Sequence, residues 1–200
     1  MVLKIVQAGE PVLRQRAREL TPEEIASPQV KQLIQLMRDT MRDAPGVGLA
    51  APQVGVGLRL VVVEDRAEYQ VGVKPEDLAA RERQPVNFHV LINPKLVVED
   101  PEPVEFHEGC LSVSGFSALV PRARGVRVEA LDENGAPVTL VARGWYARIL
   151  QHEFDHLEGM LYLDRMEPRS FTTAENHRRH WAGHPTSEVR TALGLPARSR

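Results

Sequence analysis

Two histidines and a glutamate in the stretch His152-Glu153-Phe154-Asp155-His156 have the types and the spacing of a metal site. Histidines four residues apart lie one turn apart on a helix, so both imidazoles can face a single metal ion. The glutamate between them then lies beside a water molecule on that ion and can accept its proton. The pattern favours a catalytic metal centre over the alternative, a pair of histidines hydrogen-bonded in a core.

The residues around this motif, ARGWYARILQHEFDHLEGM, predict the helix that positions it. Side chains recur at helical spacing along one face: Trp145, Ile149, His152 and His156. A second apolar face lies beside the first, and a helix that is apolar on most sides is expected to be buried. Burying ionisable side chains is costly unless they are paired or bind a metal, which again favours the metal centre.

The third metal ligand is less clear from the residues alone. The metzincin class requires a histidine where this chain has Tyr162, so that class is excluded. Glu167 and Glu175 follow the motif, but their segment has no clear helical pattern. Cys110, in FHEGCLSVSG, offers a thiolate that would complete a tetrahedral site with one open position, and we favour it. A cysteine nucleophile acting with one histidine is the remaining alternative, and it would leave the rest of the motif without a role.

Composition and charge predict a single globular domain. The 200 residues are 42% hydrophobic and 26% charged, with a formal net charge of -2, so we expect neither DNA nor a membrane as a partner. The only cysteine is Cys110, which suits a reducing cytosol. No apolar run approaches the roughly 20 residues of a membrane helix, and the first residues carry no signal-peptide core. We therefore expect a cytoplasmic protein.

The other segments predict an α+β fold. Apolar side chains at helical spacing predict a helix that begins at Pro28, is capped by Ser27, and ends before Pro45. Strands are predicted by β-branched runs and by a hairpin around an Asn-Gly turn: 58–63, 90–92, 126–131 and 138–141. We expect small antiparallel or mixed β-sheets packed around a central buried helix that carries the metal motif. The polar stretch 65–85 predicts a surface insertion or lid.

Three motifs, in order, resemble the signatures of the peptide deformylases. They are GVGLAAPQ at 46–53, EGCLS at 108–112 and QHEFDHLEG at 151–159. The resemblance extends from about Val6 to about Met166 and is greatest to the organellar-type branch, which implies a bacterial cytoplasmic enzyme of that branch. We expect a catalytic domain over residues 1–166 and a C-terminal tail over residues 167–200 that is no independent domain.

This resemblance implies a metal-dependent amidohydrolase that removes the N-formyl group from the N-terminal methionine of nascent chains and releases formate. It implies the metal ligands Cys110, His152 and His156. Glu153 would act as general base toward a metal-activated water and then as general acid toward the departing nitrogen. The backbone N–H of Leu111 and the side-chain amide of Gln53 would stabilise the charge that develops on the formyl oxygen.

The resemblance also implies how a substrate would bind. The peptide would lie extended against main-chain groups of Val47, Gly48 and Gly109, like an added strand. The methionine side chain would enter a pocket whose walls are Phe106, Glu108, Trp145 and Ile149, beside His152. Arg122 is expected to pair with Glu108 and to stiffen the loop that carries the cysteine.

The implied cofactor is one Fe²⁺ per chain, for which Zn²⁺, Ni²⁺ or Co²⁺ can substitute. The implied partners are N-formylmethionyl nascent peptides. Transient association with the ribosome stays open, because Pro185 and Pro196 weaken the case for a basic C-terminal helix. The basic and histidine-rich residues of the tail, Arg190 and His177 among them, are expected to be solvated.

Three alternatives have weaker support. A zinc endopeptidase would keep the H-E-x-x-H motif without the other two, and a structural metal module would need a fourth protein ligand. The glycines of GVGLAAPQ also fit a dinucleotide-binding loop, with Gly46, Gly48 and Ala51 at the required spacing. That loop should follow a strand and open a helix, whereas this stretch follows a predicted helix and soon reaches Pro52.

Overall fold

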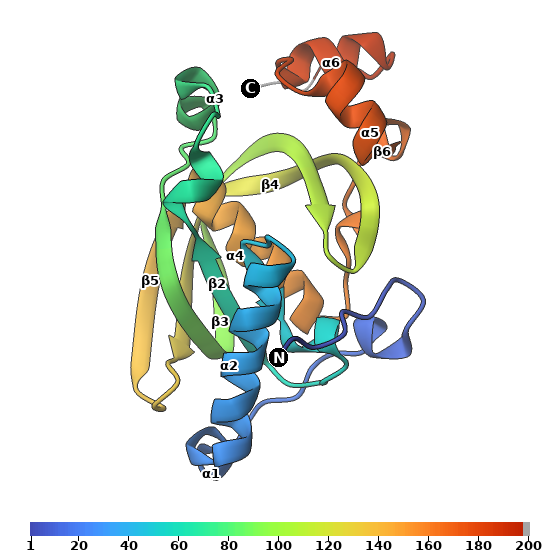
Figure 1. Ribbon diagram of the computed structural model, residues 1–200. Helices are drawn as coiled ribbons and strands as arrows, with labels where there is room; N and C mark the ends of the chain where they lie inside the picture. The colour runs from blue at the N-terminus through green and yellow to red at the C-terminus, as the bar shows by residue number, and fades with distance from the viewer. Residues whose placement is uncertain (198–200) are drawn as a thin grey trace.

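The chain folds around one bent antiparallel β-sheet with helices on both faces (Figure 1). The computed structural model describes residues 1–197. The strand order is β1-β2-β3-β4-β5, and a short β6 pairs with β4. The strands are β1 (Gly48–Ala50), β2 (Leu60–Asp65), β3 (Val86–Cys110), β4 (Val113–Leu131), β5 (Pro137–Arg143) and β6 (Thr172–Thr173). The α+β class is confirmed, although the described strands form one sheet rather than several small ones.

Two long helices, α2 and α4, were both predicted from the sequence. The α-helices are α1 (Pro22–Ala26), α2 (Pro28–Asp43), α3 (Pro75–Ala80), α4 (Gly144–Leu157), α5 (Ala174–Asn176) and α6 (Thr186–Ala192). Single turns of other helix types lie at Pro11–Arg14, Ala51–Val54, Ala67–Gln70, Tyr162–Asp164, Pro168–Ser170 and His177–Trp181. The hydroxyl of Ser27 accepts the N–H of Val30 at 3.3 Å, which confirms the predicted cap of α2. No helix within residues 1–197 is long and apolar enough to span a membrane.

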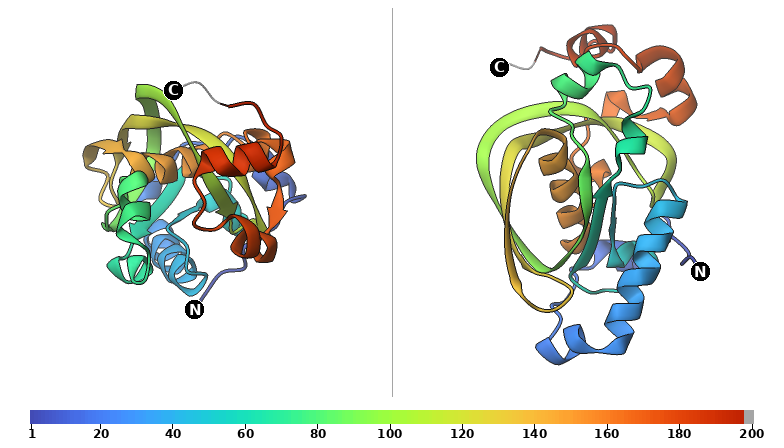
Figure 2. Two further views of the ribbon diagram at one scale, coloured as in Figure 1. Left: turned by 90° about the horizontal axis from the view of Figure 1, so that it is seen from above. Right: turned by 60° about the vertical axis from the view of Figure 1, so that its left-hand side comes forward.

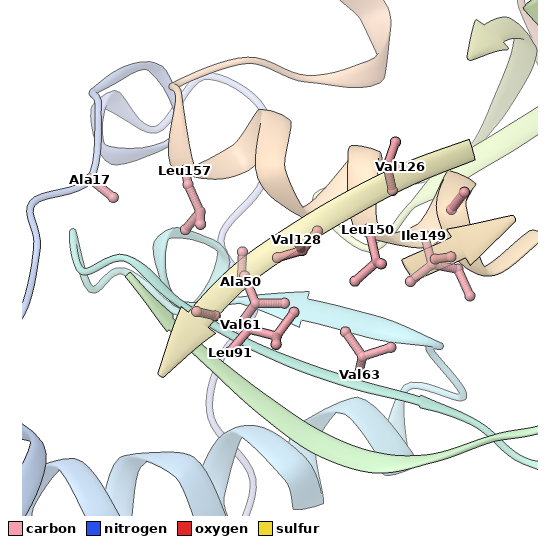
Figure 3. Packing of buried hydrophobic residues seen from close by; sticks show 13 residues of the cluster. Ala17, Ala50, Val61, Val63, Leu91, Val126, Val128, Ile149, Leu150 and Leu157 are labelled. Atoms are coloured by element: carbon pink, nitrogen blue, oxygen red, sulfur yellow. The ribbon is translucent and has the colours of Figure 1, made fainter. Parts of the chain in front are cut away.

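The apolar run of β2 is buried on both faces of the sheet. Side chains alternate along a strand. Leu60 and Val62 therefore belong to one apolar cluster with the buried residues of α2, while Val61 and Val63 belong to a second cluster with those of α4. Figure 3 shows the second cluster, in which Leu150 of α4 lies between the β2 side chains and those of β4. The bent sheet thus holds α4 in its hollow, as the right-hand view of Figure 2 shows.

Strands β3 and β4 form a long ribbon that the sequence predicted only in part. The predicted hairpin is confirmed, because Leu131 pairs with Pro137 and Gly135 occupies a positive φ of 79° in the turn. In β3, the sequence predicted only residues 90–92. The remainder of this strand contains several prolines, which usually argue against a strand. Here register shifts between Ile92 and Lys95 and again between Val98 and Pro103 absorb them, so the ribbon continues to Cys110.

The polar insertion between β2 and β3 is anchored at its base rather than free to act as a lid. The guanidinium of Arg83 donates two hydrogen bonds of 2.8 Å to Asp65, whose side chain is fully buried. The carbonyl of Arg81 accepts the N–H of Trp145 at 2.8 Å, which ties the insertion to the first turn of α4. The predicted surface insertion is therefore part of the frame around the helix.

The C-terminal segment is more ordered than the solvated tail expected from its sequence. Its helices lie at the same end of the molecule as α3 (Figures 1 and 2). Arg190 is only 5% exposed, and its guanidinium donates to both carboxylate oxygens of Glu105 on β3, at 2.8 and 3.0 Å. His177 packs against His107, with ring centroids 4.4 Å apart. For these two tail residues the expectation of solvation was wrong, because each has a partner on β3.

Arg190→Ala should detach α6 from β3 without unfolding the rest of the protein. The variant removes the ion pair that links α6 to β3, and local opening of a terminal helix costs little free energy. We expect amide hydrogen exchange over residues 186–192 to accelerate at least about tenfold, equivalent to ~1.4 kcal/mol. Arg178→Ala, an exposed arginine of the same segment, is the control and should change nothing there. Equal exchange in both variants would contradict the anchoring role.

Candidate functional site

Three side chains that can hold a metal ion meet where α4 passes the end of β3. Ligand atoms of Cys110, His152 and His156 lie within 4.8 Å of one another. The sulfur of Cys110 is 3.3 Å from Nε2 of His156. Within residues 1–197 no other His, Cys, Asp and Glu side chains form such a group, so neither Glu167 nor Glu175 belongs to it.

This donor set fits a divalent transition metal. One thiolate and two imidazoles are ligands that suit zinc, iron, nickel or cobalt. In a tetrahedral site with bonds of about 2.0–2.3 Å, the ligand atoms lie roughly 3–4 Å from one another. The separation between Cys110 and His156 is in that range. Three protein ligands leave a further position open, as in a catalytic site.

A buried network of charges orients His152. Its Nδ1 lies 3.0 Å from Oε2 of Glu108. Arg122 donates to both oxygens of that carboxylate at 2.8 and 2.9 Å, and to Asp155 at 2.7 Å. The predicted pair of Arg122 with Glu108 is therefore confirmed, and it extends to a second carboxylate on α4.

The protonation of Glu108 decides which nitrogen of His152 is available. Burial alone would raise the pKa of this carboxyl group, but the charge of Arg122 and the hydrogen bonds from His152 and Arg122 outweigh it, so the pKa lies well below its usual range. An ionised carboxylate only accepts hydrogen bonds, so Nδ1 of His152 must donate. In the neutral imidazole, Nε2 is then the nitrogen without a proton, and it can bind a metal.

Arg148 is a member of this network that the sequence did not reveal. It is 4% exposed, and it donates to Glu108 at 2.5 Å and to the backbone carbonyls of Val120 and Val104. The available signal was its position four residues before His152, which places both side chains on the same side of the helix. Two arginines therefore compensate the buried Glu108.

Glu153 lies in the same cavity and is 5% exposed. Burial raises the pKa of its carboxyl group to about 7. One of its oxygens, Oε2, has no hydrogen-bond partner among the described residues. Its side chain lies directly against Gly48: a Cβ at that position would be 2.6 Å from Cδ of Glu153. Only glycine leaves room for the carboxylate in this place.

Gly48→Ala should therefore displace the Glu153 carboxylate and lower kcat/KM by about 10²-fold for any reaction that uses this carboxylate, as expected for a misplacement of about 1 Å. The matched control is Gly57→Ala, because a Cβ at Gly57 would have no atom within 4 Å. Steady-state kinetics of both purified variants measure the effect. Equal activity of the two variants would show that the close approach has no role in positioning the carboxylate.

The side-chain amide of Gln53 points toward Cys110, one of the three candidate metal ligands. Its Oε1 accepts the N–H of Ala50 at 2.9 Å, which fixes the orientation of the side chain. Its Nε2 consequently lies 3.5 Å from the sulfur of Cys110 and 3.3 Å from Oγ of Ser112. The side chain is 1% exposed, so it is held in a water-poor setting.

A cavity of about 410 Å³ contains almost all of the residues expected at the site. The following of them line it: Val47, Gly48, Gln53, Glu108, Gly109, Cys110, Leu111, Trp145, Ile149, His152 and Glu153. His156, which is 1% exposed, does not line it, and neither does Phe106. Its ring packs edge-on against Trp145, with centroids 6.1 Å apart, and lies under the guanidinium groups of Arg81 and Arg148. These cation–π contacts hold Phe106 behind the tryptophan.

The cavity opens beside an edge strand. Strand β1 pairs with β2 on one side, and within residues 1–197 no strand pairs with its other side. Gly48, its first residue, lines the cavity together with Val47, whose carbonyl accepts the N–H of Glu64 at 3.1 Å. A strand edge without a pairing partner can pair with an extended peptide.

Known proteins share this sequence and this fold. The polypeptide deformylase family model matches residues 2–171. The chain belongs to this family. Peptide deformylase 3 of Streptomyces avermitilis is 47% identical over 194 residues, which are 96% of this chain and 84% of that protein. The Met-Ala-Ser-bound class I type b peptide deformylase from Acinetobacter baumannii has a TM-score of 0.73 and 34% identity, covering 83% of this chain and 99% of that one.

A plant deformylase is also similar but longer. The chloroplastic peptide deformylase 1A of Solanum lycopersicum is 48% identical over 172 residues, which are 86% of this chain. The chain spans 62% of the length of that relative. Deformylases depend on a metal, and the cysteine with two histidines is a candidate site for it in this member of the family.

Proposed function

We propose that this chain is a peptide deformylase, which hydrolyses the N-formyl group of the N-terminal methionine of newly synthesised proteins and releases formate. The observation that carries the proposal is the meeting of Cys110, His152 and His156 in a deformylase-family chain. Two of these residues line the same cavity as the buried Glu153. The proposal includes α4 as the central catalytic helix, a catalytic domain over residues 1–166, and a cytoplasmic location. The tail over residues 167–200 is no independent domain, and its last three residues lie outside the described part of the chain.

Cys110, His152 and His156 would hold the metal, which we propose to be Fe²⁺ with Zn²⁺, Ni²⁺ or Co²⁺ as substitutes. When bound, such an ion supplies a Lewis acid for the formyl oxygen and lowers the pKa of a water molecule toward about 7. The hydrogen bond between His152 and Glu108 supports this assignment, since in the neutral imidazole it keeps the proton on Nδ1 and leaves Nε2 as the nitrogen that can bind the metal.

The protein's own groups would carry the proton and orient the substrate. Glu153 accepts a proton from the attacking water at its carboxylate and returns it to the departing amide nitrogen, so that an amine leaves. The amide of Gln53 and the backbone N–H of Leu111 donate to the formyl oxygen as it gains negative charge, and one such donor contributes about 3–4 kcal/mol. The position of the Gln53 amide near Cys110 supports its part in this step.

The substrate would be an extended N-formylmethionyl peptide. Its backbone pairs with main-chain groups of Val47, Gly48 and Gly109, beside the open edge of β1. Glu108, Trp145 and Ile149 form the wall around the methionine side chain, with Phe106 supporting Trp145 from behind. Neither DNA nor a membrane is a proposed partner, and docking on the ribosome stays an open alternative.

Metal removal tests this proposal. Treating the protein with a chelator should abolish formate release from a formyl-methionyl tripeptide, and adding Fe²⁺ or Ni²⁺ under anaerobic conditions should restore it. The iron form should lose activity in air, because Fe²⁺ beside an accessible thiolate is sensitive to oxidation. Activity that persists through both chelation and aeration would contradict the assigned metal chemistry.

A further inference from the structure

Two phenylalanine rings form a stacked pair at the rim of the cavity. The rings of Phe116 and Phe171 are nearly parallel, with centroids 4.9 Å apart and an interplanar angle of 7°. Each residue remains 41% exposed, although a large apolar side chain is normally covered. Phe116 lines the cavity that Glu153 also lines. Phe171 comes from the C-terminal segment, which runs beside the first residues of β4 (Figure 1).

The backbone around Phe171 is firmly attached to β4. Leu119 accepts the N–H of Glu167 and donates its own N–H to the hydroxyl of Ser170, both at 2.8 Å. On the other side of Phe171, β6 pairs with the residues that include Phe116. The backbone that carries both rings is therefore held before any ligand arrives, and a surface that is already ordered loses little entropy on binding.

Among residues 1–197, no charged side chain belongs to the exposed lining of the cavity. Its exposed lining residues are Pro45, Gly109, Ser114, Gly115, Phe116 and Ala174. The charged lining residues Glu108, Arg148 and Glu153 are all buried. The exposed rim therefore offers apolar and main-chain contacts to a ligand, and the stacked rings are its largest apolar feature.

The position of the pair relative to the candidate metal ligands indicates what it contacts. In the proposed function the formyl end of the peptide lies beside Cys110 and Glu153 at the buried end of the cavity, so the following residues must leave through the exposed rim. An extended peptide advances about 3.3 Å per residue. The side chains next to the rim therefore belong to the residues that follow the methionine.

We propose that Phe116 and Phe171 form a platform that binds an apolar, above all aromatic, side chain at the second or third residue of the substrate. This inference rests on the proposed function for the direction of the peptide. It gives the C-terminal segment a part in substrate selection, since half of the platform comes from it. An aromatic side chain on such a platform should improve binding about three- to tenfold over a small polar one.

The experiment compares peptides that differ only at those two residues. Binding of the products Met-Ala-Ser, Met-Ala-Phe and Met-Phe-Ser is measured by calorimetry, and kcat/KM is measured for their formylated forms. The variants are Phe171→Ala, Phe116→Ala and the conservative Phe171→Tyr. The control is Val141→Ala, which shortens a 66% exposed side chain on β5 outside the lining residues of the cavity.

We expect wild type, Phe171→Tyr and Val141→Ala to prefer a phenylalanine-containing peptide about three- to tenfold. Phe116→Ala and Phe171→Ala should lose that preference through a change in KM. The inference is overturned if no peptide is preferred, or if the preference survives both alanine substitutions. The binding arm needs no turnover. A preference in product binding without release of formate would therefore refute the proposed function and support the platform. Formate release without a preference would support the proposed function and refute the platform.

Discussion

Glu153→Gln is expected to lower kcat for formate release by about 10²–10⁴-fold, the usual contribution of a general base. The amide has the shape of the carboxylate but cannot accept the proton of the attacking water. The space beside Gly48 stays filled and the three ligands are unchanged, so metal content should remain at the wild-type level. Single-turnover kinetics and metal analysis on the same preparation separate loss of the base from loss of the metal.

Glu175→Gln provides the matched control for this substitution. Glu175 follows the motif and was one of the alternative ligands, but it is exposed and lies outside the metal group. It should therefore keep wild-type activity and metal content. If Glu153→Gln and Glu175→Gln released formate at the same rate, Glu153 would not be the base.

Arg122→Ala is expected to lower the free energy of unfolding by about 3–5 kcal/mol, because it leaves Glu108 and Asp155 buried without their shared cation. Arg148 and Arg165 still contact these carboxylates, which favours the lower part of that range. Metal should also be lost faster to a chelator, since Glu108 orients a ligand histidine. Denaturant titration and timed metal release measure the two effects.

Arg124→Ala is the control on the same strand, two residues further along. Its guanidinium binds Glu82 and Glu102 in ion pairs at the surface, so its removal should cost less than about 1 kcal/mol and leave metal release unchanged. Equal losses of stability in the two variants would contradict the structural role assigned to the buried network.

Much of the site could be predicted because its signals are local in the sequence. The spacing of His152 and His156 fixes their common face once α4 is recognised, and α4 is recognised from its apolar period. Cys110 was favoured because the motif needs a third ligand, and the structure brings its sulfur close to His156, although nothing local shows that β3 ends beside the helix. The α2 helix and the β4–β5 hairpin carry their own cap and turn residues, so they were predicted with similar boundaries.

What the sequence did not reveal depends on contacts between distant segments. Arg190 pairs with Glu105, and Phe171 stacks on Phe116, although each pair is far apart along the chain. No periodicity in the C-terminal segment signals either contact, because its helices are short. The length of β3 was missed for another reason: its prolines oppose a strand locally, and only the pairing with β4 shows that bulges accommodate them.

The most direct test of the proposed function is formate release from formyl-Met-Ala-Ser by anaerobically purified wild-type protein with its metal bound. We predict one formate and one free Met-Ala-Ser for each peptide consumed, with the peptide bonds left intact. Protein that binds stoichiometric metal and releases no formate, or that cleaves the peptide bond after methionine instead, would contradict the proposed function.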